Sequence, residues 1–243
     1  MRVRSSVRQI ETPVGTARVH LARPDRQDTQ GGPGGPVGAL VLGHGAGGGV
    51  EAPDLLALTS LTADGWLVAR VEQPWRVAGR RIATPPAQLD TAWLAVLHRL
   101  TTGRARLPVP LVVGGRSAGA RVACRTAEAV GAAAVLALSF PLHPPGRPDK
   151  SRADEARLVL DAGLPLAVVQ GERDAFGGPQ EVRAALGKRA VVRPARGTHS
   201  FSKDPADVVQ EVRGWLATLC HTPLRGLGRS PDDTGNAGAQ RRC

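Results

Sequence analysis

The chain of 243 residues has no tyrosine, three phenylalanines, four tryptophans and a single methionine, so few aromatic side chains are available for its core. Hydrophobic residues still make up 42% of the chain, and we expect a core of alanine, valine and leucine. With so few aromatic rings to stack on bases, a platform for single-stranded nucleic acid is not expected. The sequence also has no run of eighteen apolar residues, which argues against a membrane-spanning helix.

Cysteine is scarce as well. Cys124, Cys220 and Cys243 are odd in number and widely spaced, which fits neither a disulfide framework nor a zinc site. We therefore expect no metal and no cofactor. The first residues lack the apolar segment of a signal peptide, and the simplest expectation is a reduced protein of the cytoplasm. Nothing in the sequence indicates an oligomeric state.

Lysine supplies only three of the 32 basic residues, so arginine carries almost all of the net charge of +11. A basic balance of this size raises the question of nucleic-acid binding. The arginines are scattered, however, with modest clustering around Arg76, Arg80 and Arg81 and no run of five basic residues. We predict a solvated, arginine-rich surface. We expect neither nucleic acid nor a membrane to be a partner of this protein.

Apolar strand-like segments alternate with amphipathic helical segments after an N-terminal hairpin over residues 3–10 and 16–21. Further strands are predicted over residues 38–42, 66–71, 109–113, 133–138, 166–170 and 190–193. Helices are predicted over residues 53–63, 88–100, 120–130, 152–160 and 179–186, followed by a last helix that begins with Asp204 as N-cap and Pro205. This alternation predicts an α/β fold, with a mostly parallel, doubly wound sheet flanked by helices. We expect one domain over residues 1–220 and a disordered tail over residues 221–243.

One stretch has the local sequence of a nucleophile elbow. The apolar run of residues 109–113 leads into Gly115-Arg116-Ser117-Ala118-Gly119, and a helix-forming run follows. A serine on a sharp turn from strand to helix needs glycine on both sides, because a Cβ there would collide with a neighbouring strand or helix. The turn also places the hydroxyl at a helix N-terminus, where N–H groups favour a developing oxyanion. The alternative is a plain turn of glycine and serine.

Three more features directly follow predicted strands: a glycine-rich loop over residues 43–49, Asp174 and His199. The carboxyl ends of parallel strands meet at one edge of a sheet, so we expect these features to lie beside Ser117. A serine hydroxyl is too weakly acidic to attack a carbonyl unaided; a histidine must take its proton and a carboxylate must orient that histidine. We predict Ser117 as nucleophile, His199 as general base and then acid, and Asp174 as the orienting carboxylate.

Two alternatives stay open at this point. His143 also lies beyond a strand end and is the rival base, while Glu172 is the rival carboxylate. His44 follows a strand too, and we expect it to brace the glycine-rich loop. Cys124 is expected to pack beneath the site without taking part in its chemistry.

The backbone N–H groups of Ala46 and Ala118 are expected to form the oxyanion hole. We predict Arg116 and His143 as substrate-binding residues. Arg116, with Arg147, hints at an anionic substrate, although a solvated position at the elbow is the alternative for Arg116. Residues 141–164 are expected to form a short cap over the site.

With these motifs in view, the chain resembles the dienelactone-hydrolase-like branch of the α/β-hydrolases over roughly residues 10–220. More narrowly, it is similar to the group that shares its α/β-hydrolase-like domain with a testis-expressed protein and a subunit of a histone acetyltransferase complex. The resemblance rests on residues 43–48, 114–119, 141–146, 171–174 and 198–200. Dienelactone hydrolases use a cysteine nucleophile, so Ser117 argues against that particular reaction.

These observations predict a serine hydrolase that cleaves a small ester, thioester or amide through an acyl-enzyme on Ser117. The alternative is a hydrolase-fold binding or scaffold protein without catalysis, a role that members of the narrower group fill. The presence of Ser117, Asp174 and His199 together favours the enzyme, because a scaffold need not retain all three. The expected partner is a small acyl substrate, whose identity the sequence does not give.

Overall fold

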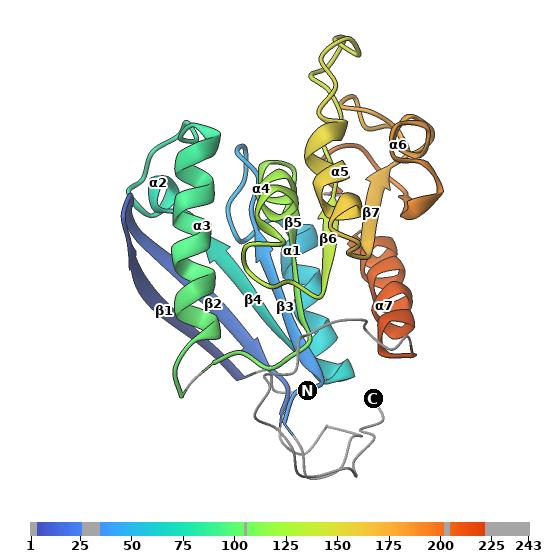
Figure 1. Cartoon of the computed structure of the whole chain (residues 1–243). Helices are drawn as coiled ribbons and strands as arrows, with labels where there is room; N and C mark the ends of the chain where they lie inside the picture. The colour runs from blue at the N-terminus through green and yellow to red at the C-terminus, as the bar shows by residue number, and fades with distance from the viewer. Residues whose placement is uncertain (1–3, 26–34, 105, 202–204, 222–243) are drawn as a thin grey trace.

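The computed structural model describes residues 4–25, 35–104, 106–201 and 205–221. Within these residues, eight strands form one sheet in the order β1-β2-β4-β3-β5-β6-β7-β8 (Figure 1). β2 pairs antiparallel with both β1 and β4, and all the other neighbours are parallel. The strands are β1 (Arg4–Thr12), β2 (Gly15–Arg23), β3 (Gly38–Gly43), β4 (Trp66–Glu72), β5 (Leu111–Arg116), β6 (Ala134–Leu138), β7 (Leu166–Gly171) and β8 (Ala190–Ala195). The predicted α/β class, with its antiparallel N-terminal hairpin, is confirmed.

Helices cover both faces of the sheet (Figure 1). They are α1 (Pro53–Ala57), the 3₁₀ helix η1 (Leu58–Asp64), α2 (Pro74–Val77), α3 (Pro86–Thr101), α4 (Ala118–Thr126), α5 (Ala153–Asp161), α6 (Pro179–Leu186), the 3₁₀ helix η2 (Gly187–Arg189) and α7 (Pro205–His221). The central strands β3, β5, β6 and β7 are buried along their whole length. Their continuous apolar runs follow from being covered on both sides.

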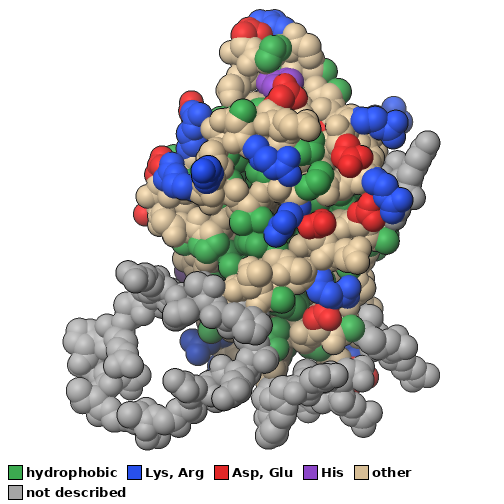
Figure 2. Space-filling view, turned by 90° about the vertical axis from the view of Figure 1, so that its right-hand side faces the viewer, with side chains coloured by type: hydrophobic (Ala, Val, Ile, Leu, Met, Phe, Trp, Pro, Cys, Tyr) green, Lys and Arg blue, Asp and Glu red, His purple; other side chains and the backbone are tan. Residues whose placement is uncertain are grey.

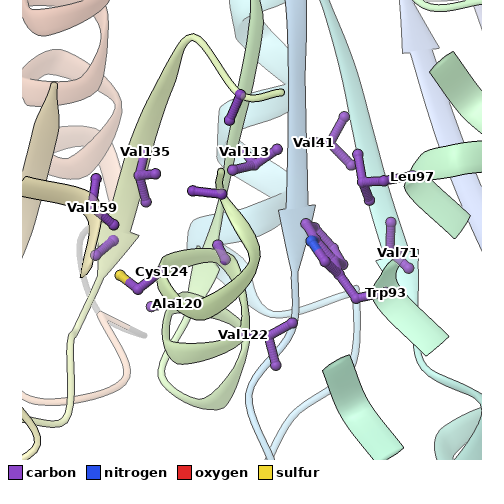
Figure 3. Close-up of a cluster of buried hydrophobic side chains, with 14 of the residues drawn as sticks. Val41, Val71, Trp93, Leu97, Val113, Ala120, Val122, Cys124, Val135 and Val159 are labelled. Atoms are coloured by element: carbon purple, nitrogen blue, oxygen red, sulfur yellow. The ribbon is translucent and has the colours of Figure 1, made fainter. Parts of the chain in front are cut away.

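Two apolar clusters fill the space between the sheet and the two helical layers. Successive side chains of a strand point to opposite faces, so Val41 and Val113 join one cluster while Leu40 and Val112 join the other. The first cluster lies under α3, α4, α5 and α6, and Figure 3 shows Trp93 among its side chains. The second lies under α1, η1 and α7. As the composition predicts, valine, leucine and alanine make up most of both clusters.

The segment predicted as one helix over residues 53–63 is instead a short α-helix followed by a 3₁₀ helix. The hydroxyls of Thr59, Ser60 and Thr62 each donate to the carbonyl three residues earlier. Such bonds compete with the regular α-helical pattern and favour the tighter turn. Gly65, in the left-handed region at φ 85°, then ends the helix.

Smaller differences concern the ends of elements. The one-turn helix α2 was not predicted, because a single turn has no periodicity to read. α4 ends at Thr126, earlier than expected, and α7 continues to His221. The predicted cap residue Asp204 and the expected tail beyond His221 lie outside the described residues. No helix among those residues is both long and apolar enough to cross a membrane.

On the face shown in Figure 2, arginines alternate with acidic side chains. Three of the arginines at the surface are paired: Arg213 lies 2.7 Å from Asp64, Arg196 lies 2.7 Å from Asp207, and Arg189 lies 3.1 Å from Asp161. Pairing of this kind offsets part of the positive charge of the surface. The expectation that nucleic acid is not a partner stays a prediction.

Candidate active site

Ser117 occupies the turn between β5 and α4, at the centre of the sheet. Its backbone lies at φ 53° and ψ −111°, a conformation that L-residues rarely adopt. The Ser117 N–H donates to the carbonyl of Leu138 on β6, 2.9 Å away, which ties the turn to the neighbouring strand. Strain held in place by surrounding structure is typical of functional turns, and it leaves the serine side chain at the carboxyl edge of the sheet.

The glycines around Ser117 are required by close backbone packing. A Cβ on Gly115 would lie 2.5 Å from the carbonyl oxygen of Gly43 in β3. A Cβ on Gly119 would overlap the backbone of Gly43 and lie 2.9 Å from the carbonyl oxygen of His44. The first turn of α4 therefore sits directly on the end of β3, which brings the glycine-rich loop against the elbow.

Ser117, His199 and Asp174 form one chain of hydrogen bonds. His199 Nε2 lies 2.9 Å from Ser117 Oγ, and His199 Nδ1 lies 2.9 Å and 3.0 Å from the two carboxylate oxygens of Asp174. A carboxylate can only accept, so Nδ1 carries the proton and Nε2 is free to accept from the serine hydroxyl. The Asp174 side chain is fully buried, whereas the His199 side chain is 21% exposed.

The Asp174 carboxylate accepts two hydrogen bonds besides those that it makes with His199. Its Oδ1 accepts from the Phe176 N–H at 2.9 Å, and its Oδ2 accepts from Gln170 Nε2 at 2.9 Å. The Phe176 ring also packs on the His199 ring, with centroids 4.2 Å apart. The role of Gln170 was not predicted from the sequence. A glutamine inside a fully buried strand could have indicated it, because a buried polar group needs hydrogen-bond partners.

His44 braces the glycine-rich loop, as expected. Its Nε2 accepts from the Gln73 N–H at 3.1 Å, so Nδ1 carries the proton and donates to the Gly45 carbonyl at 2.8 Å. Burial lowers the pKa of His44 below its ordinary value, which keeps the ring neutral. The loop from β3 is thereby tied to the segment that follows β4.

The predicted oxyanion donors, Ala46 and Ala118, line the same small pocket. The pocket lies between the glycine-rich loop and the start of α4. Its other walls are mostly apolar and come from α3, α4 and the α2 region, with Trp75, Ala83, Leu89 and Val122 among the lining residues. The pocket therefore lies next to the elbow, against Ala118 and Gly119 rather than against Ser117 itself.

Arg116 does not face solvent, in contrast to the alternative considered for it. Its side chain is 9% exposed and lies 3.1 Å from the fully buried Asp54. Its Nη2 donates to the backbone carbonyl of His199 at 2.9 Å. The guanidinium is therefore engaged by protein groups, which argues against the predicted role of Arg116 in binding an anionic substrate.

His143 and Glu172 occupy other places. The His143 ring contacts the Pro144 carbonyl at 2.9 Å and Glu181 at 3.3 Å, and no hydrogen bond among the described residues joins it to Ser117. Glu172 is exposed, unlike Asp174. The structure therefore brings together Ser117, His199 and Asp174, and it leaves the two rivals outside the chain of hydrogen bonds.

Residues 141–164 differ from the cap that was expected. Their helix, α5, packs beside α4 and α6 and contributes Ala156 and Val159 to the first apolar cluster. It is the crossover helix between the parallel strands β6 and β7, and only the loop before it rises above the sheet edge (Figure 1). Cys124 is buried in the same cluster, where burial raises the pKa of its thiol to about 12 and leaves it unreactive.

Similar solved structures share this fold. Est1E from Butyrivibrio proteoclasticus is 17% identical with a TM-score of 0.69, and the alignment covers 90% of this chain and 100% of that one. An α/β serine hydrolase without a lid from Xanthomonas campestris is 19% identical with a TM-score of 0.65, covering 90% and 96%. Dienelactone hydrolase from Anabaena variabilis is 16% identical with a TM-score of 0.64, covering 90% and 99%.

Sequence comparison with curated proteins finds no match. The alpha/beta hydrolase domain family matches residues 36–213, from the start of β3 into α7. That span holds the glycine-rich loop, the elbow and both partners of Ser117. The chain belongs to the alpha/beta hydrolase family.

Proposed function

We propose that this protein is a serine hydrolase that cleaves a small ester, thioester or amide through an acyl-enzyme on Ser117. The observation that carries the proposal is the continuous chain of hydrogen bonds from Ser117 through His199 to the buried Asp174. The similarity to proteins described as esterases and serine hydrolases supports hydrolase chemistry in general.

In the proposed first step, Ser117 Oγ attacks the carbonyl carbon of the substrate while His199 Nε2 takes the hydroxyl proton. The electron pair of the carbonyl π bond moves to oxygen. When the tetrahedral intermediate collapses, the leaving group departs with the proton from His199, and the acyl group stays on Ser117. Water then repeats the sequence in place of the serine. Asp174 keeps the Nδ1 proton in place and stabilises the imidazolium that forms in each half-reaction.

The oxyanion is assigned to the N–H groups of Ala118 and Ala46. Ala118 is the first residue of α4, so its N–H has no partner within the helix and lies at the positive end of the helix dipole. Ala46 comes from the loop that Gly43 and His44 hold against the elbow. Two donors fixed by backbone packing need no rearrangement when charge develops on the oxygen.

The pocket beside the elbow favours a small acyl group. Trp75 and Leu89, both nearly fully buried, close it on the side of α2 and α3. Because these walls are part of the packed core, a long acyl chain would require repacking at a cost of about 1–3 kcal/mol. Acetyl and propionyl esters are therefore the substrates to test first.

A fluorophosphonate probe followed by peptide mass mapping tests the proposal. We expect a single adduct on Ser117, since the tetrahedral phosphorus places an oxygen where the oxyanion would lie. Labelling is expected to vanish in Ser117→Ala and nearly vanish in His199→Ala. Ser139→Ala is the matched control, because Ser139 also has a positive φ beyond a strand end, but it is fully buried and has no histidine partner among the described contacts.

Two outcomes would count against the proposal. A folded wild-type protein that stays unlabelled at excess probe would favour a hydrolase-fold binding or scaffold protein. Labelling that survives His199→Ala and disappears in His143→Gln would move the base to His143.

A further inference from the structure

A single guanidinium joins three segments that lie far apart in the sequence. Arg116 Nη2 donates to the carbonyl of His199 at 2.9 Å, and its Nε lies 3.1 Å from Asp54 Oδ2. Its Nη1 lies against the glycine-rich loop, 3.1 Å from the position that a Cβ on Gly45 would take. The residue next to the nucleophile thus touches the loop of the base, the oxyanion loop and α1.

The Asp54 side chain is completely buried, as is that of Asp174. Asp54 Oδ1 accepts from the Leu55 N–H at 3.1 Å, and burial raises the pKa of Asp54 while Arg116 opposes that rise. A buried ion pair seldom adds net stability over apolar side chains of equal volume. The presence of this pair beside Ser117 is therefore better explained by what it holds in place than by stability.

We propose that Arg116 is a positioning residue for His199, itself anchored by Asp54. His199 follows the edge strand β8, and its ring must stay within 2.9 Å of both Ser117 Oγ and Asp174. The bond from Arg116 fixes the His199 backbone to the residue that directly precedes Ser117. Base and nucleophile are then held to one another through a single side chain.

Asp54 has a second part in this arrangement. His199 becomes positively charged when it takes the serine proton, and an unpaired guanidinium at its carbonyl would repel that charge. The Asp54 carboxylate balances Arg116, so the pair positions His199 without opposing the imidazolium. This inference rests on the proposed function, and it gives Arg116 a different task from anion binding.

The two tasks predict different kinetics. A residue that binds substrate raises KM when it is removed, whereas a residue that positions the base lowers kcat. For hydrolysis of p-nitrophenyl acetate, a neutral ester, we expect Arg116→Met to lower kcat about 100-fold, which is the effect of misplacing a catalytic group by about 1 Å. KM is expected to change by less than about twofold. The labelling rate with fluorophosphonate is expected to fall in parallel with kcat.

Arg116→Lys and Arg125→Met complete the kinetic test. A lysine can pair with Asp54 but cannot also reach the His199 carbonyl in the fork geometry of arginine, so we expect it to restore the melting temperature without restoring kcat. Arg125, at 16% exposure, pairs with Asp90 at 2.6 Å and with Glu155 at 3.1 Å, and it lies near the C-terminal end of α4, whereas the elbow is at the N-terminal end. Breaking that pair is a matched control that is expected to leave kcat unchanged.

A spectroscopic readout separates this inference from the proposed function. The proton on His199 Nδ1, which is bound to Asp174, is expected to give a low-field NMR signal that His199→Gln removes. Its exchange with water is expected to be at least about tenfold faster in Arg116→Met and unchanged in Arg125→Met, because a loosened loop opens more often. This measurement needs no substrate, so it decides the positioning role even if the wild-type protein shows no hydrolysis.

The inference is overturned if Arg116→Met folds and retains wild-type kcat and proton exchange. It is equally overturned if Arg125→Met lowers kcat and speeds the proton exchange as much as Arg116→Met does. The effect would then follow from breaking any ion pair. A rise in KM at constant kcat would instead assign Arg116 to substrate binding.

Discussion

Replacement of Asp174 by asparagine tests the hydrogen-bond geometry most directly, because it removes charge while keeping shape. Each carboxylate oxygen of Asp174 accepts from a fixed donor, Oδ1 from the Phe176 N–H and Oδ2 from Gln170 Nε2. An asparagine NH₂ must replace one of the two oxygens. In either orientation a donor then faces a donor.

Gln170 cannot relieve this conflict by turning its amide. Its Nε2 also donates to the Phe140 carbonyl at 3.2 Å and the Gly177 carbonyl at 2.7 Å, so a flipped amide would put its oxygen against both. One buried donor therefore stays unpaired in Asp174→Asn. We expect a loss of about 1–3 kcal/mol in the free energy of unfolding, with the fold retained.

The effect on turnover is larger. An NH₂ group facing His199 Nδ1 favours the tautomer with the proton on Nε2, which cannot accept from Ser117 Oγ. We expect kcat to fall by about 10⁴-fold, equivalent to about 5.4 kcal/mol in the activation barrier. Initial rates with p-nitrophenyl acetate and urea denaturation measure the two effects separately. Glu172→Gln is the control, and near-normal turnover in Asp174→Asn together with a loss in Glu172→Gln would refute the assignment.

Three further predictions concern stability. Gly119→Ala is expected to destabilise the protein by about 3 kcal/mol or more in urea denaturation, because its Cβ would overlap the backbone of Gly43; a cost under 1 kcal/mol would mean that the two backbones separate easily. Gly214→Ala, with no atom within 4 Å of the added Cβ and an ordinary helical backbone in α7, is expected to stabilise by about 1 kcal/mol, and a lower melting temperature would contradict this. Burial lowers the pKa of His44 below its ordinary value of 6.5. As the pH falls through 6.5, the unfolded chain therefore binds a proton at this residue before the folded protein does. The free energy of unfolding falls as a result. Between pH 7.5 and 5.5 this one group accounts for a loss of at most about 1.4 kcal/mol, and His44→Gln is expected to show a correspondingly smaller drop.

The sequence was sufficient to predict the sheet and to bring Ser117, Asp174 and His199 together. Buried parallel strands have continuous apolar runs, and residues that follow such strands share one edge whatever their distance in the chain. The glycines at positions 115 and 119 could be interpreted as part of an elbow, because glycine is required on both sides of the serine where the backbone packs closely against a neighbouring strand or helix. These inferences depend on local patterns and on one general property of parallel sheets.

Arg116, Asp54 and Gln170 could not be placed in the same way. An arginine that directly precedes the serine of a predicted elbow gives no local sign that it turns inward, and its partner Asp54 lies 62 positions away in the sequence. Asp54 itself sits in the first turn of a helix, where acidic residues are common on the surface. Long-range pairing between polar side chains depends on how loops pack, and periodicity carries no information about it.

The sheet order has a consequence for how activity would be lost. Ser117 follows the central strand β5, whereas His199 follows β8, the strand at the edge of the sheet. Edge elements open before central ones, because fewer neighbours hold them. Mild heat or a low concentration of denaturant would then abolish turnover while the core stays folded. Turnover would return on cooling or on removal of the denaturant. Loss of turnover would serve as an early gauge of fraying at this edge, ahead of any change in the circular dichroism of the whole protein.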